Sequence, residues 1–76
     1  MYEEFIEYVK KNYMNNRVVV QKRNGKHFKA TVEGIDEEWV YFRNDVVTSF
    51  VRIEDISGMK LLPPNPVEEE EVKQGG

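Results

Sequence analysis

Residues 25–36 read Gly-Lys-His-Phe-Lys-Ala-Thr-Val-Glu-Gly-Ile-Asp, and this stretch decides the fold. Apolar residues from Phe28 to Val32 alternate with polar ones, which predicts a β-strand with one buried face. Ile35 has the opposite parity, so the strand can bury it on the same side only by bulging before it. Gly34 stands at that point, and glycine permits a bulge. We therefore expect a sharply bent strand, of the kind found in small barrels.

Turn and strand signals extend outward from this strand in both directions. Asn24-Gly25 is typical of a hairpin with a type I′ turn, which needs positive φ at both central residues. Apolar residues at helical spacing near the start predict an amphipathic helix. The expected elements are a helix over residues 2–14 and strands over residues 18–23, 26–36, 39–43, 46–53 and 56–62. The expected fold class is mostly β: an N-terminal α-helix followed by a strongly bent, five-stranded antiparallel SH3-like barrel.

The chain of 76 residues has room for one small domain. We assign this domain to residues 1–62, because the proline-rich residues 63–66 cannot continue a strand ladder. Residues 63–76 are rich in proline and then acidic, with few apolar side chains, so we expect a disordered tail. A thin core without disulfides leaves oligomerisation as the route to extra stability.

Side chains for catalysis or metal binding are scarce in this sequence. It has no cysteine and one histidine, His27, which excludes thiolate metal sites and a histidine cluster. Ser49 and Ser57 have no triad or nucleophile-elbow context around them. We therefore expect neither an enzyme nor a bound metal or cofactor.

Charge is distributed unevenly along the chain. Residues 63–76 carry four glutamates and one lysine and so account for the formal net charge of −3, while residues 1–62 hold the remaining 10 basic and 10 acidic groups. Residues 17–29 contain five basic and no acidic side chains, and residues 33–38 contain four acidic and no basic ones. The first hairpin is therefore a candidate surface for tracking phosphates, with a merely solvated strand surface as the alternative.

The first four residues, Met-Tyr-Glu-Glu, are acidic, whereas a secretory signal peptide begins with basic residues. No apolar run approaches the length of about 18 residues that a membrane-spanning helix needs. We expect a cytoplasmic protein that makes no membrane contact.

Two segments resemble the motifs of the Sm and Sm-like family. The first motif combines glycines, apolar residues, one small residue and a final aspartate at fixed spacing, and it is matched at Gly25, Phe28, Ala30, Val32, Gly34, Ile35 and Asp36. Ala30 replaces a more usual glycine. Residues 51–56, Val-Arg-Ile-Glu-Asp-Ile, resemble the second motif with Ile53 in place of its glycine. On these residues the chain is identified as a divergent member of the Sm-like family.

The resemblance implies an Sm-type barrel whose fourth and fifth strands pair between neighbouring subunits. Such pairing would close a homo-oligomeric ring of about five to seven copies. Rings of this family bind single-stranded RNA in RNA processing, stability or chaperone roles. Single-stranded RNA and further copies of the chain are therefore the implied partners.

The resemblance also implies a set of RNA-binding residues. Asp36 matches the aspartate that orients the first RNA-binding loop, and Trp39 takes the position whose side chain stacks on a base. Val40 replaces an asparagine that reads the base edge, and Arg52 matches an arginine that contacts base or phosphate. Since valine cannot form that hydrogen bond, weak base discrimination is expected. Ile53-Glu54 replaces the Lys-His pair of bacterial Hfq, so a pocket of that type is not expected.

Each of these residues also has a purely structural interpretation. Trp39 could belong to the core or to a subunit interface, and Asp36 could serve only to form a turn. Arg52 could pair with Asp36, Glu54 or a neighbouring subunit. The corresponding alternative for the whole chain is an SH3-like barrel that acts as a structural or protein–protein assembly module without RNA binding.

Overall fold

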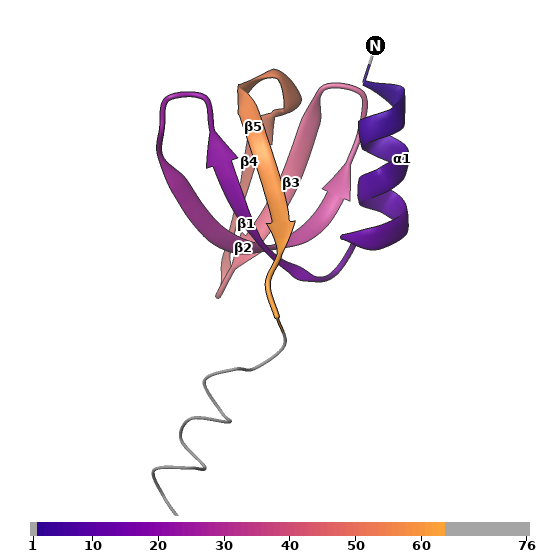
Figure 1. Ribbon diagram of the computed structural model, residues 1–76. Coiled ribbons are helices and arrows are strands. Elements are labelled where there is room, and N and C mark those ends of the chain that lie inside the picture. The colour runs from indigo at the N-terminus through magenta and orange to yellow at the C-terminus, as the bar shows by residue number, and fades with distance from the viewer. Residues whose placement is uncertain (1, 64–76) are drawn as a thin grey trace, which may run out of the picture.

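A computed structural model describes residues 2–63 and consists of one helix and one antiparallel sheet (Figure 1). The elements are α1 (Glu3–Asn12), β1 (Arg17–Lys22), β2 (His27–Ile35), β3 (Trp39–Asn44), β4 (Val47–Arg52), a 3-10 turn at Ile53–Asp55, and β5 (Ile56–Leu61). The strand order in the sheet is β4-β3-β2-β1-β5, with every neighbouring pair antiparallel. The mostly β fold with an N-terminal helix is therefore confirmed.

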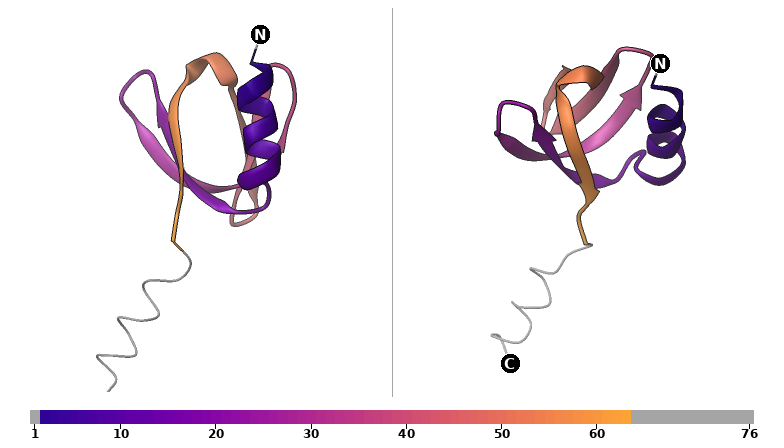
Figure 2. Two further views of the ribbon diagram at one scale, coloured as in Figure 1. Left: turned by 45° about the vertical axis from the view of Figure 1, so that its right-hand side comes forward. Right: turned by 45° about the horizontal axis from the view of Figure 1, so that its top comes forward.

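The helix α1 begins and ends with charges that favour its dipole. Glu3 and Glu4 stand in the first turn, and Lys10 and Lys11 stand in the last. Val9 points inward and is completely buried, so it anchors the helix to the sheet. Asn15 then takes a positive φ of 66°, which reverses the chain into β1. Figure 2 shows α1 lying alongside the curved sheet rather than in line with it.

The core lies on the inner side of the bent sheet. It contains Val9, Val18, Val20, Ala30, Val32, Val40, Phe42, Ile53 and Ile56. Alternation along β1, β2 and β3 places these side chains inward, as the spacing in the sequence predicts. The rings of Phe28 and Phe42 meet edge to face at 5.3 Å between centroids. No side chain of the core is polar within the described residues.

The bulge expected in β2 is present. The register between β2 and β3 shifts between Val32 and Gly34, so that Gly34 pairs with Tyr41 and Ile35 with Val40. The Tyr41 ring lies over the glycine, and a Cβ added to Gly34 would be 3.5 Å from it. The bulge therefore turns β2 where the sequence indicates, and Tyr41 covers the backbone there.

The β1–β2 turn differs from the expected type I′ turn. Gly25 has a positive φ of 90°, whereas Asn24 does not. The Gly25 N–H donates to the Lys22 carbonyl oxygen at 3.0 Å, and the Asn24 Oδ1 accepts from the Lys26 N–H at 3.0 Å. The hydrogen bond of the Asn24 side chain thus helps to close the turn. The turn needs a positive φ at Gly25 alone, whereas a type I′ turn needs it at both central residues.

The sheet is not closed into a barrel, which corrects the expected architecture. The strands β4 and β5 form its two edges, and within residues 2–63 no pairing joins them. The 3-10 turn carries the chain from β4 across the open side of the sheet to β5, which pairs with β1 (Figure 1). The result is a strongly curved, open sheet with two free edges. The predicted tail, residues 63–76, lies outside the described residues apart from Pro63.

Candidate nucleic-acid interface

Asp36 organises the turn between β2 and β3. Its Oδ1 accepts hydrogen bonds from the N–H groups of Glu38 at 2.9 Å and Trp39 at 2.8 Å, and its Oδ2 accepts one from the Tyr41 hydroxyl at 2.8 Å. The two backbone hydrogen bonds, then the tyrosine, lower the pKa of Asp36, and the same carboxylate raises the pKa of Tyr41. Asp36 therefore forms the turn, and the turn presents Trp39.

Trp39 and Arg52 meet on the outer face of β3 and β4. They are directly paired across the two strands, and the guanidinium carbon lies 4.9 Å from the centre of the indole ring. This distance is that of a cation–π contact. The structure thus brings together two of the residues that the Sm-like motifs single out, although they are 13 positions apart in the chain.

Two carboxylates already engage the charge of Arg52. Its Nη1 lies 2.7 Å from the Glu38 Oε2 and 3.9 Å from the Glu54 Oε2. The pair with Glu54 is one of the structural alternatives expected from the sequence, whereas the pair with Asp36 is not found. Glu38 was missed because its contact depends on the shape of the turn that Asp36 builds. An incoming phosphate therefore meets a guanidinium that is already paired.

Val40 lies apart from these residues. Its side chain is completely buried in the core, between the cross-strand neighbours Ile35 and Val51. It faces the opposite side of β3 from Trp39, because alternate residues of a strand point to opposite faces. Val40 therefore takes no part in the surface site.

An aromatic strip extends the Trp39 side of the sheet. It consists of Trp39, Tyr41 and Phe50, with ring centroids 5.3 Å apart for Trp39 and Phe50 and 6.0 Å for Tyr41 and Phe50. The Phe50 side chain is 58% exposed. Tyr41 and Phe50 were not among the expected site residues. The period-two spacing of Trp39 and Tyr41 signals their shared face, but only the strand register brings Phe50 of β4 against both rings.

A second surface, the basic face, covers the outer side of β2, β1 and β5. We define it by the charged residues Arg17, Lys29 and Lys60 together with His27, Gln21, Val19 and Gly58. Val19 pairs with Lys29 on one side and Lys60 on the other, and Gln21 pairs with His27 and Gly58. Within residues 2–63, only Arg43 and Arg52 form ion pairs, so the three cations of this face have no carboxylate partner there.

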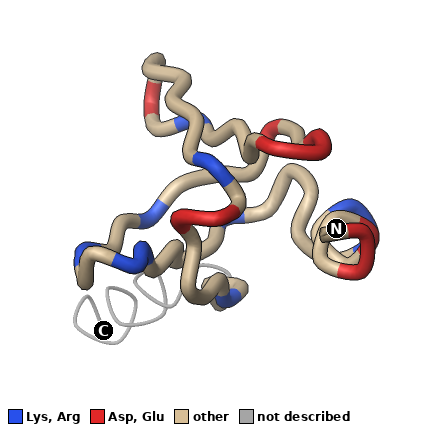
Figure 3. Tube along the Cα trace, turned by 90° about the horizontal axis from the view of Figure 1, so that it is seen from above, with Lys and Arg blue, Asp and Glu red and all other residues tan. Residues whose placement is uncertain are grey.

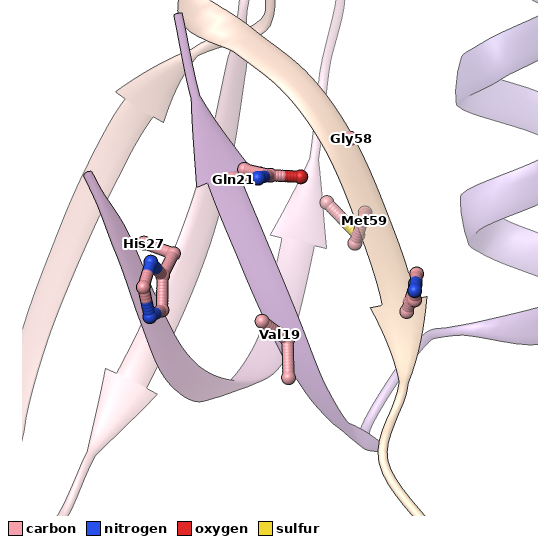
Figure 4. A pocket seen from close by; sticks show the side chains of 6 residues that line it. Val19, Gln21, His27, Gly58 and Met59 are labelled. Carbon is pink, nitrogen blue, oxygen red and sulfur yellow. The ribbon is translucent and has the colours of Figure 1, made fainter. Parts of the chain in front are cut away.

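A pocket of about 310 Å³ opens on the basic face (Figure 4). Residues of three neighbouring strands line it, namely Val19, Gln21, His27, Gly58, Met59 and Lys60. Val19 and Met59 make part of its wall apolar, whereas Gln21, His27 and Lys60 can donate hydrogen bonds. Gly58 leaves room beside Gln21, whose Oε1 would lie 3.6 Å from a Cβ at that position. The pocket can thus contact a ligand that joins an anion to an apolar body.

The two signs of charge are only partly separated on the folded chain, since Arg43 pairs with Glu33 and Arg52 with Glu38. Figure 3 shows acidic positions gathered at the start of α1 and at separate turns, with basic positions elsewhere along the trace. Lys60 was missed at the sequence level because it lies far from the basic hairpin in the chain and joins it only through β1–β5 pairing.

The edge strands expose apolar side chains. Val47 is 60% exposed on β4, and Leu61 is 50% exposed on β5. Unpaired strand edges of this kind are templates for pairing with another chain. The two edges differ in sequence, so a contact between β4 of one copy and β5 of another would be heterologous.

No family model matches the chain, and no curated protein matches it. Within residues 2–63, no three side chains of the types His, Cys, Asp and Glu come close enough together to hold a metal ion. In the same part of the chain, no helix is both long and apolar enough to cross a membrane.

Proposed function

We propose that the protein is a cytoplasmic, Sm-like RNA-binding module whose copies join edge to edge into a homo-oligomeric ring and bind single-stranded RNA. The observation that carries this proposal is the basic face, whose cations Arg17, Lys29 and Lys60 have no carboxylate partner within residues 2–63. Lysine and arginine that neutralise phosphates release condensed counterions, and this release drives nucleic-acid binding.

The open edges of the sheet support the assembly part of the proposal. Pairing of β4 with β5 of the next copy satisfies both edges and buries Val47 and Leu61, which are half or more exposed in the single chain. Because the contact is heterologous, repetition closes a ring when the rotation matches. The resemblance to the Sm-like family implies about five to seven copies. Assembly also repeats the basic face around the ring, which multiplies a modest local field.

The aromatic side of the sheet supplies the base contacts of the proposal. Trp39, held by the Asp36 turn, offers a ring for base stacking, which contributes ~1–3 kcal/mol per base and tolerates any sequence. Arg52 next to it contacts phosphate or base. Val40 is buried and reads no base edge, so the proposed site discriminates weakly among bases.

Fluorescence anisotropy of labelled oligouridine and oligoadenosine tests the RNA part. We expect binding that weakens steeply as salt rises, since phosphate neutralisation dominates the affinity. The single tryptophan gives a second signal from the chain itself. Absence of binding to every homopolymer at low salt would contradict the proposal.

Light scattering after gel filtration tests the assembly part. We expect several times the chain mass of 9.0 kDa. Val47→Lys on the β4 edge should shift the protein towards the monomer, because a charged edge side chain opposes strand pairing. Val46→Lys is the matched control, since Val46 is 88% exposed but lies outside the strand. A monomeric wild-type protein, or equal effects of the two substitutions, would exclude edge-to-edge pairing.

A second candidate function is an assembly module that binds no RNA. The ion pairs of Arg52 with Glu38 and Glu54 favour it, because they leave the cation beside Trp39 already paired. Under this alternative the oligomer forms as above, and neither homopolymer binds.

A further inference from the structure

The chain itself occupies both groups that a nucleotide would contact beside the β2–β3 turn. The Arg52 guanidinium covers the Trp39 ring at 4.9 Å, and the Glu38 carboxylate holds that guanidinium at 2.7 Å. The Glu54 carboxylate lies farther away, at 3.9 Å. Glu38 is thus the closest anion to Arg52 and occupies the place that a ligand phosphate would take.

The backbone of Glu38 is fixed at both of its polar groups. Its N–H donates to the Asp36 Oδ1 at 2.9 Å, and its carbonyl oxygen accepts from the Ile53 N–H at 2.8 Å. The second hydrogen bond ties the turn to the residue that follows Arg52. These hydrogen bonds fix the backbone from which the Glu38 side chain reaches Arg52.

We infer that Glu38 is a specificity-determining residue, which competes with ligand phosphate for Arg52 and thereby controls access to the Trp39 ring. The inference rests on the proposed function and names how its aromatic site selects a ligand. A ligand that offers only phosphate exchanges one anion for another at Arg52 and gains little. A ligand that also offers an unpaired base gains the stacking surface that Arg52 uncovers, so single strands are preferred over duplexes.

Glu38→Gln tests this inference, with Glu37→Gln as the matched control. Both substitutions remove one negative charge from the same turn, but within residues 2–63 the side chain of Glu37 makes no ion pair. We expect Glu38→Gln to tighten oligouridine binding about two- to fivefold, the range expected for loss of one exposed ion pair, and to raise duplex RNA binding as well. Glu37→Gln should give a smaller change, and thermal unfolding should show both variants folded.

The double variants Glu38→Gln/Arg52→Ala and Glu37→Gln/Arg52→Ala separate competition from general charge. The gain from Glu38→Gln should vanish when Arg52 is absent, because the competitor then has nothing to release. Equal gains from the two glutamine variants, or a gain that survives without Arg52, would overturn the inference. Wild-type binding that Glu38→Gln leaves unchanged overturns the inference alone. Failure of every variant to bind any RNA overturns the proposed function, and the inference falls with it.

Discussion

The basic face and the Trp39–Arg52 site carry their positive charge in opposite ways. On the basic face, Lys29 and Lys60 flank Val19 and have no carboxylate partner within residues 2–63. On β3 and β4, Arg52 is held between an aromatic ring and two carboxylates. The first surface is open to any polyanion, whereas the second opens only to a ligand that replaces its internal contacts.

The difference implies that one surface attracts phosphates and that the other selects ligands with an unpaired base. Unpaired cations on a strand surface attract phosphates from a distance and give no sequence or strand preference. A ring covered by a paired arginine gives little attraction but rewards a base that can stack. In the proposed ring, the basic face would therefore supply affinity, and the Trp39–Arg52 site would supply the preference for single strands.

The largest expected change in RNA affinity comes from reversing the charge of the basic face. The double variant Lys29→Glu/Lys60→Glu should weaken oligouridine binding by at least about tenfold at low salt and flatten the salt dependence, because two phosphate contacts become repulsions. Anisotropy titrations at several salt concentrations measure both quantities. Lys10→Glu/Lys11→Glu makes the same change of charge on α1 and serves as the control.

Equal losses in these two variants would mean that net charge alone governs binding. The distinction between the two surfaces would then have no basis in the location of charge. A loss confined to the strand variant would identify the outer side of β2, β1 and β5 as the main phosphate contact.

Local sequence signals predict much of this fold because they act over a few residues. The parity change at Ile35 and the glycine before it predict the bulge in β2, and the register shift confirms it. The type I′ turn predicted at Asn24-Gly25 was wrong, since the Asn24 side chain closes the turn in a way that the dipeptide alone does not reveal. The prediction that the sheet closes into a barrel was also wrong. Closure depends on whether β4 and β5, at opposite ends of the strand order, come together.

The site shows the same division between local and long-range information. Asp36 as a turn former and the Arg52–Glu54 ion pair could be expected from the sequence, and both are present. The contact of Glu38 with Arg52 could not be predicted, since it depends on the shape of a turn. The place of Lys60 beside the basic hairpin could not be predicted either, since it depends on the β1–β5 register. The burial of Val40 follows from strand alternation, which a comparison of motif positions does not consider.

A smaller effect is expected when the turn beneath Trp39 is loosened by pH. The folded pKa of Asp36 is lowered, so its stabilising contribution is present above its unfolded pKa of about 3.9 and is lost as pH falls through the folded value. The folded pKa of Tyr41 is raised, so its contribution is present below about 10 and is lost as pH rises through the folded value.

Fluorescence of Trp39 during acid and alkaline titration measures these two changes. Asp36→Asn should weaken the turn at neutral pH and remove the acid transition of the tryptophan signal, while Tyr41→Phe should remove only the alkaline one. The basic face does not contain Asp36, so binding through it should not follow the acid transition. An unchanged acid transition in Asp36→Asn would assign it to another carboxylate.

The smallest expected effect is that of Arg52→Ala on RNA affinity. The removed cation is already paired with Glu38, so the affinity for oligouridine should fall by less than about threefold, as expected for a group within exposed ion pairs. Lys29→Ala removes one unpaired cation and should cost more, and the two variants are compared in the same anisotropy titration. A greater loss from Arg52→Ala would reverse the assignment of attraction to the basic face. It would also mean that a ligand displaces Glu38 with little resistance, because the arginine could contribute so much only if it already met phosphate in the wild-type complex.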